Sequence, residues 1–288
     1  METERKILKD CPISCFADEI STSLDRQIAV LHDLGISHIE LRSTDNVNVA
    51  DYSMDYAKEV RRKLADAGIR VSAIGSPIGK IGIEDDFNEH LKKLQHVETL
   101  ADLFETKYIR MFSFYMPENS DPSAYRDPVF FRMEQMVNEA AHSGITLLHE
   151  NEKGIYGDNA PRCLELMKQF YGDAFRCTFD FANFVQCRQD TLAAYEMLKP
   201  YITYVHIKDA KTADGTVVPA GTGDGNVNRI LTALDQTGYN GFLSLEPHLA
   251  NFAGLGSLEK DAAVRVENDT EKAFCVAYRA LEKILTGK

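Results

Sequence analysis

Short apolar runs alternate with amphipathic stretches from one end of the chain to the other. The apolar runs are rich in β-branched and aromatic residues and lie between turn signals, a pattern that is typical of buried strands. Between the runs, apolar residues recur at three- and four-residue spacing, as at Ile28, Leu31 and Leu34, which predicts helices. The expected strands begin at Ile13, His38, Arg70, Tyr108, Ile145, Arg176, Ile202 and Gly241.

Glycines mark the expected ends of several helices. Each stands shortly before the next strand-like run, where a left-handed backbone costs glycine no steric penalty; they are Gly35, Gly68, Gly144 and Gly238. Strands that alternate with helices predict a parallel sheet, and eight such units predict a closed (β/α)8 TIM barrel of the α/β class. We expect one domain over residues 1–288, completed by a last helix from roughly Asn268 to Leu285.

The longest insertions all follow the carboxyl ends of expected strands, the face on which barrel enzymes carry their chemistry. They cover residues 117–126, 152–161, 210–225 and 248–266. The third contains PAGTGDG at 219–225, which is either a tight turn or a cradle of backbone amides for a phosphate. Because it lacks the GxxxxGK pattern, we favour the turn.

Four potential metal ligands stand near the carboxyl ends of four successive expected strands. They are Glu150 in ITLLHEN, Asp180 in RCTFDFAN, His206 in ITYVHIKD and Glu246 in GFLSLEPH. A single glutamate at a strand end is more often a cap or an ion-pair partner, but four suitable residues on four successive strands favour a metal site. Three carboxylates and one imidazole suit Mn²⁺, Mg²⁺ or Co²⁺, and Zn²⁺ also remains open. The set predicts a metal-dependent enzyme.

The alternation of side chains along a strand identifies neighbours of these residues. Residues two apart share a face, so Lys208 accompanies His206, and His248 accompanies Glu246, one step nearer the barrel mouth where substrate would lie. By the same rule His149 and Asp209 point away from the metal, and we expect structural roles for both.

For several other polar residues the sequence allows either substrate binding or a structural role. Lys208 binds substrate or forms an ion pair with a neighbouring acid such as Asp180. Glu40, at the end of HIELR, is a structural acid or a substrate-binding one, and we slightly favour structure. We expect Arg42 and Arg110 to form salt bridges at the barrel rim more readily than to clamp a phosphate, although Arg110 remains a candidate for substrate binding.

Charge and composition exclude several classes of partner. The chain has 44 acidic and 32 basic residues and a formal charge of -12, which disfavours nucleic acid. No apolar stretch approaches the ~20 residues that span a membrane, so we expect no membrane partner. The chain opens with the charged METERK and its six cysteines form no CxxC pair, which predicts reduced thiols in a cytoplasmic protein.

Several motifs resemble one known family over nearly the whole chain, the sugar phosphate isomerase/epimerase group of the xylose isomerase-like TIM barrels. They are HEN at 149–151, FDFANF at 179–184, HIKDA at 206–210 and SLEPHL at 244–249. The resemblance implies that Glu150, Asp180, His206 and Glu246 bind one divalent cation. It also implies a small keto-sugar or sugar phosphate as substrate. A homo-oligomer is a further expectation, since dimers and tetramers are common in such barrels.

The chemistry that suits this site is proton transfer next to a carbonyl. A metal stabilises the negative charge that develops on the substrate oxygens, while two carboxylates act as base and acid. This resembles the family's cis-enediolate mechanism and assigns those roles to Glu150 and Glu246. Lys208 and Arg110 would neutralise a phosphate, a carboxylate or the enediolate, and His248 would hold a substrate hydroxyl.

Three other functions are compatible with this fold, and the sequence does not favour them equally. A dehydratase, similar to inosose dehydratases, would use the same base and ligands, so it is the main alternative. A DNA repair endonuclease of the same architecture needs extra histidines and a basic groove, whereas SAIGSPIG at 72–79 has no histidine and the chain is acidic. A non-catalytic sugar-binding barrel is disfavoured because both proton-transfer carboxylates are present.

Overall fold

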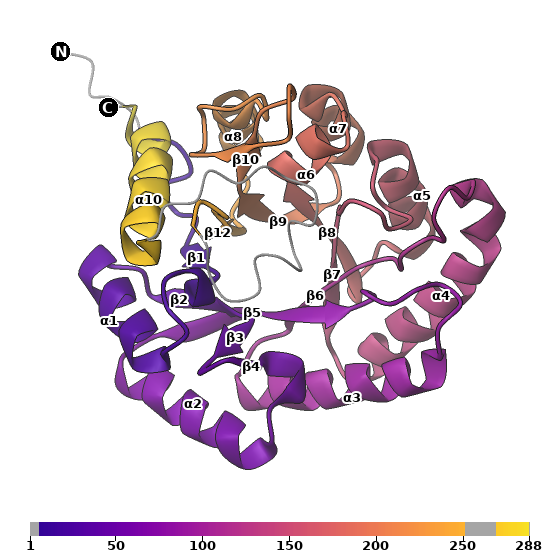
Figure 1. Ribbon diagram of the computed structural model, residues 1–288, viewed down its shortest axis with the longest axis horizontal. Coiled ribbons are helices and arrows are strands. Elements are labelled where there is room, and N and C mark those ends of the chain that lie inside the picture. Colours follow the sequence, from indigo (N-terminus) through magenta and orange to yellow (C-terminus); the bar gives the residue numbers. More distant parts are fainter. Residues whose placement is uncertain (1–5, 251–268, 288) are drawn as a thin grey trace.

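Eight parallel strands form a nearly closed barrel in the computed structural model, which describes residues 6–250 and 269–287. The hydrogen-bonded order is β1-β12-β9-β8-β7-β6-β5-β2, and the two end strands, β1 and β2, lie next to each other (Figure 1). The strands are β1 (Ile13–Cys15), β2 (His38–Leu41), β5 (Arg70–Ile78), β6 (Tyr108–Met111), β7 (Thr146–Glu150), β8 (Phe175–Asp180), β9 (Ile202–Ile207) and β12 (Phe242–Leu245). The predicted TIM barrel is confirmed, and each of these eight strands overlaps an expected run.

Helices surround the barrel and cover the outer face of the sheet (Figure 1). The predicted helix stop at Gly35 follows the first of them and has a left-handed φ of 70°. The last described helix agrees with the predicted one, whose expected first residue, Asn268, lies outside the described residues. The helices are α1 (Leu24–Leu34), α2 (Met54–Asp66), α3 (Phe87–Leu103), α4 (Arg126–His142), α5 (Ala160–Phe170), α6 (Phe181–Gln186), α7 (Thr191–Leu198), α8 (Val227–Gln236) and α10 (Thr270–Thr286).

A layer of hydrogen-bonded hydroxyl groups fills the barrel below the candidate site. Ser72 Oγ lies 2.6 Å from Ser14 Oγ and 2.8 Å from Tyr204 OH, and all three residues are buried. Because Tyr204 stands two residues before His206 on β9, both side chains point into the barrel, as the alternation predicts. Buried hydroxyls that are paired in this way fix the floor beneath His206.

Two short hairpins, which the sequence pattern did not predict, extend the rim. They are β3 (Ser43–Thr44) with β4 (Val47–Asn48), and β10 (Asp209–Ala210) with β11 (Val217–Val218). The PAGTGDG segment follows the second hairpin and is a turn. Its backbone N–H groups at Gly221, Gly223 and Gly225 each donate to the Asp209 carboxylate at 2.9 Å. These amides are therefore engaged by the protein itself, and Asp209 has the structural role expected of it.

Most of the predicted insertion at 248–266 lies outside the described residues. Within the part of the chain that the structure describes, no helix is both long enough and apolar enough to cross a membrane.

Candidate metal centre

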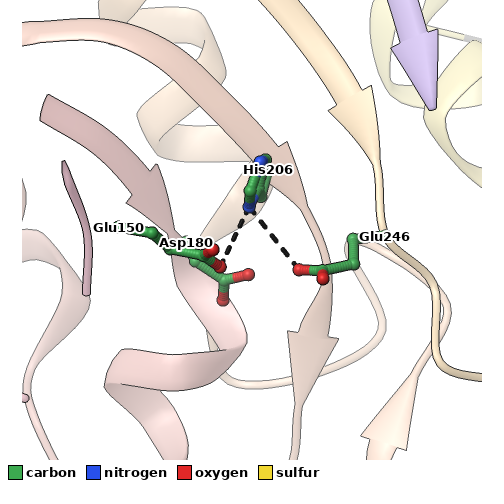
Figure 2. A group of neighbouring side chains, drawn as sticks. All are labelled: Glu150, Asp180, His206 and Glu246. Atoms are coloured by element: carbon green, nitrogen blue, oxygen red, sulfur yellow. Dashed lines mark hydrogen bonds and ion pairs between the residues drawn. The ribbon is translucent and has the colours of Figure 1, made fainter. Parts of the chain in front are cut away.

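The four predicted ligands meet at the carboxyl end of the barrel (Figure 2). Each offers one ligand atom, and these atoms all lie within 4.8 Å of one another. His206 Nδ1 lies 3.0 Å from Glu150 Oε1 and 3.5 Å from Glu246 Oε2. All four side chains are buried. The strands thus bring together residues that are up to 96 positions apart in the sequence, as Glu150 and Glu246 are.

The strand-to-helix junction at FDFAN positions Asp180. Asp180 ends β8 and is the N-cap of α6, so its Oδ1 accepts a hydrogen bond from Asn183 N at 2.7 Å. Asn183 Nδ2 in turn donates to Glu150 Oε1 at 3.2 Å. Asp180 Oδ2 is buried and accepts no hydrogen bond from the described residues; its charge partner is Lys208 Nζ, 3.2 Å away. One carboxylate oxygen is therefore held by the helix, and the other faces the cluster.

Glu40 fixes the orientation of the imidazole. His206 Nε2 lies 3.1 Å from Glu40 Oε2, and Ser244 Oγ donates to the same oxygen at 2.7 Å. A carboxylate accepts hydrogen bonds, so Nε2 carries a proton and Nδ1 is directed at Glu150 and Glu246. Metal-binding histidines commonly have such a carboxylate partner on the other nitrogen. Glu40 thus has the structural role that the sequence slightly favoured.

The donor set fits one divalent cation. Three carboxylates and an imidazole offer the oxygen and nitrogen ligands that Mn²⁺, Mg²⁺, Co²⁺ or Zn²⁺ take. Burial raises the pKa of Asp180 to about 7; Lys208 opposes this rise, and the charges of Glu150 and Glu246 add to it. Asp180 Oδ2, which accepts no hydrogen bond from any described residue, and the concentration of negative charge around it would both be stabilised by a cation.

Glu150 and Glu246 are held in the ionised form. Burial would raise the pKa of Glu150, but His206 and Arg110 outweigh it and hold the value at about 2. Burial acts in the same direction on Glu246, whose pKa Lys208 and His248 keep well below its usual range. Both carboxylates can therefore accept a proton at neutral pH.

Two predicted substrate-binding cations reach these carboxylates. Lys208 Nζ lies 3.1 Å from Glu246 Oε2 as well as near Asp180, so the ion pair that the sequence left open is present. Arg110 Nη1 lies 3.3 Å from Glu150 Oε2 and 3.4 Å from Glu246 Oε1. We expected a salt bridge at the rim for Arg110, but it is buried within the site.

Arg42 and two acids after β1 were not predicted as parts of the site. Arg42 Nη1 lies 3.2 Å from Glu246 Oε1, while its other nitrogens contact Asp18 at 2.8 and 3.1 Å and Glu19 at 3.3 Å. Arg42 is thus a salt-bridge partner, as expected, but inside the barrel mouth. The acid pair of FADE at 16–19, directly after the first apolar run, was the signal that could have identified Asp18 and Glu19.

His248 lies beside Glu246, as predicted, although it follows the end of β12 and has a left-handed φ of 46°. Its Nε2 is 3.5 Å from Glu19 Oε1 and 3.6 Å from Glu246 Oε1, and its backbone N–H donates to Glu19 Oε2 at 2.7 Å. Glu19, Glu246 and His248 are close enough to form a second cation site. The guanidinium of Arg42 already contacts both glutamates, so it supplies the positive charge there. His149 points elsewhere, with its Nε2 3.0 Å from Ser113 Oγ.

Residues 28–267 match the family described as the xylose isomerase-like TIM barrel. This chain belongs to that family. The resemblance stated from the motifs is thereby confirmed, and it extends over most of the described strands and helices.

One sequence match and three solved structures show the range of proteins to which the chain is similar. The chain is 23% identical over 185 residues to 3-dehydroshikimate dehydratase of Bacillus anthracis, a match that covers 64% of this chain and 65% of the relative's length. The structure of the probable 3-DHS dehydratase AsbF from Bacillus anthracis superposes with a TM-score of 0.73, at 18% identity, over 94% of this chain and 98% of that one.

A D-tagatose 3-epimerase-like protein has a TM-score of 0.70, at 16% identity, over 95% of this chain and 98% of its own. The structure of the IOLI protein, which contains a zinc atom, has a TM-score of 0.73 at 15% identity. The match covers 96% of this chain and 98% of the IOLI chain. Similarity at these identities establishes the common barrel and leaves the reaction open.

Proposed function

We propose that this protein is a divalent-metal-dependent isomerase or epimerase of a small keto-sugar, free or phosphorylated. The observation that carries the proposal is the pair of buried, ionised carboxylates, Glu150 and Glu246, which lie on either side of His206 (Figure 2). Two such groups can exchange protons with two faces, or two neighbouring carbons, of a substrate held between them.

The proposed metal ligands are Glu150, Asp180, His206 and Glu246. When bound there, a divalent cation supplies Lewis-acid stabilisation of negative charge on the substrate oxygens. The IOLI structure, a neighbour in fold, contains a zinc atom, which supports a divalent metal in a barrel of this kind. Asn183 and Glu40 would hold Glu150 and His206 in the required orientations.

The proton steps belong to the protein's own carboxylates. One carboxylate removes the proton next to the carbonyl, and the electrons of the broken C–H bond become those of an enediolate. The other returns a proton to the opposite face, which is epimerisation, or to the adjacent carbon, which is isomerisation. Lys208 and Arg110, both within 3.4 Å of these carboxylates, would neutralise an anionic group or the enediolate oxygen, and His248 would bind a hydroxyl.

Dehydration is the second candidate, and the similarity to 3-dehydroshikimate dehydratase favours it. In that reaction the base removes the α-proton, the C–H electrons form a C=C bond, and the β-hydroxyl leaves as water after it takes a proton. The first step is the same as in isomerisation, so the residues above do not distinguish the two. The match spans 65% of that relative's length, and the activity is therefore carried over as a proposal only.

Deuterium exchange followed by mass spectrometry tests both candidates. The Mn²⁺-loaded protein is incubated in D₂O with free and phosphorylated ketoses, inososes and keto acids, including 3-dehydroshikimate. Gain of one deuteron at unchanged formula identifies an isomerase or epimerase, and loss of water identifies a dehydratase. No exchange with any compound, despite bound metal, would contradict an enolising enzyme.

Variants of the carboxylates test their assigned roles in the same assay. Glu150→Gln and Glu246→Gln should each abolish exchange while the fold is retained. Glu98→Gln is the matched control, because Glu98 is a buried glutamate of α3 that contacts Ser143 outside the site. Wild-type rates in either site variant would rule out the mechanism with two carboxylates. A homo-oligomer and a cytoplasmic location remain predictions, for which gel filtration and cell fractionation are the tests.

A further inference from the structure

A cavity of about 810 Å³ opens at the end of the barrel opposite the candidate metal centre. We call it the basal cavity. The first residues of four strands line it, namely His38 of β2, Arg70 of β5, Tyr108 of β6 and Phe242 of β12. The candidate metal ligands lie at the carboxyl ends of parallel strands, so the basal cavity is on the opposite face. Its outer wall is formed by α2 and by the segment that follows α3, and the helices α2 and α3 are neighbours in Figure 1.

Positive charge is concentrated around the basal cavity. Among the described residues, its lining includes one acidic side chain, Glu105. It also includes five basic side chains: Lys58, Arg61, Arg62, Arg70 and Lys107. The chain as a whole has a formal charge of -12 and repels anions in general. A local excess of positive charge in an acidic protein therefore indicates a site for a negatively charged ligand.

The cations are available for such a ligand. Three of the five form ion pairs on the surface. Arg61 pairs with Glu105, Arg62 Nη1 lies 3.0 Å from Asp66 Oδ2, and Lys58 Nζ lies 3.4 Å from Asp55 Oδ1. These side chains are exposed to solvent, so the pairs contribute little. Arg70 and Lys107 are exposed at the cavity and form no ion pair with an acidic side chain within residues 6–250 and 269–287. An anion that enters the cavity can thus be bound without the loss of a buried salt bridge.

Aromatic rings form the floor of the cavity. Phe242 packs edge-to-face on His38 with ring centroids 5.1 Å apart, and Tyr108 packs in the same way on Tyr204 at 6.4 Å. Phe242 and Tyr108 are partly exposed, and Lys107 Nζ lies 5.2 Å from the centre of the Tyr108 ring. A planar ring bound here would contact aromatic and aliphatic surface while its charged group reached the guanidinium groups.

We propose that the basal cavity binds a nucleotide, a planar base that carries phosphate groups. Its volume lies within the range of ~300–1,000 Å³ that is usual for small-molecule sites. The arginines suit phosphate oxygens, because a guanidinium can donate two parallel hydrogen bonds. The aromatic floor suits the base. This site is independent of the metal centre and of the reaction proposed for it.

Isothermal titration calorimetry with ATP, in a metal-free buffer of low ionic strength, tests the proposal. The double variant Arg70→Glu/Lys107→Glu reverses two exposed charges of the cavity and should weaken ATP binding at least tenfold. The matched control Lys168→Glu/Arg229→Glu makes the same change of net charge at exposed positions of α5 and α8. It should bind ATP to within about twofold of the wild type.

Tripolyphosphate and adenosine separate the two halves of the site. Each should bind at least tenfold more weakly than ATP, because each lacks one of the two interactions. Equal affinity for tripolyphosphate and ATP would overturn the assignment to a nucleotide. Absence of ATP binding at 1 mM, or equal weakening in the cavity variant and the matched control, would overturn the site itself.

Discussion

Replacing Glu40 by glutamine tests whether this residue prepares His206 for a metal. Glu40 is fully buried. Its Oε2 accepts hydrogen bonds from His206 Nε2 at 3.1 Å and from Ser244 Oγ at 2.7 Å, and its Oε1 lies 3.3 Å from His206 Nε2. Glutamine has nearly the same shape. It lacks the negative charge, however. One of the two carboxylate oxygens near His206 Nε2 is replaced by an NH₂ group, so two hydrogen-bond donors would face each other.

The size of the effect follows from these contacts. Burial lowers the pKa of His206, but the carboxylates of Glu150 and Glu40 reverse this and raise it well above its usual range. Removing the Glu40 charge makes the imidazole a poorer electron donor and loosens its orientation. Loss of such a partner typically reduces metal affinity 10- to 100-fold, or about 1.4–2.7 kcal/mol.

Competition of Mn²⁺ with a fluorescent chelator measures the affinity directly. Glu40→Gln should bind Mn²⁺ 10- to 100-fold more weakly than the wild type, with circular dichroism unchanged. Glu98→Gln, which alters a buried glutamate of α3, should retain wild-type affinity and thereby controls for the general cost of the substitution. Wild-type affinity in Glu40→Gln would refute the reasoning that Glu40 prepares the metal ligand.

Two further predictions concern stability. Asp209→Ala leaves the amides of Gly221, Gly223 and Gly225 without their acceptor and should lower the free energy of unfolding by about 1–3 kcal/mol; urea unfolding measures the loss, and faster hydrogen exchange confined to 219–225 should accompany it. His90 is buried and its Nε2 accepts a hydrogen bond from Gly79 N at 2.7 Å, and burial lowers its pKa to about 4. Between pH 6.5 and 4 the unfolded chain therefore binds a proton that the folded chain does not, so stability falls as the pH falls through this window. His90→Gln should make that decline shallower by about 1 kcal/mol per pH unit; equal slopes in urea unfolding at pH 7, 6 and 5 would contradict it.

The positions of the strands and the candidate ligands could be predicted because both depend on local patterns. Runs such as ITYVHIKDA show the alternation of a strand, and the polar residue near each run's end identifies the carboxyl edge of the sheet. Parallel strands bring those edges together whatever the details of packing. The cluster of Glu150, Asp180, His206 and Glu246 follows from the topology for this reason.

The partners of these residues could not be predicted, because they depend on contacts across the barrel. Glu40 reaches His206 over 166 positions, and Arg42 reaches Glu246 over 204. Sequence spacing contains no information about which buried arginine meets which carboxylate once the barrel closes. The sequence by itself determined the barrel and the four candidate ligands, since local alternation encodes them, and its motifs indicated the family. Only the tertiary structure decided that Glu40 orients the imidazole, that Arg42 and Arg110 lie inside the mouth, and that Asp209 holds the glycine-rich turn.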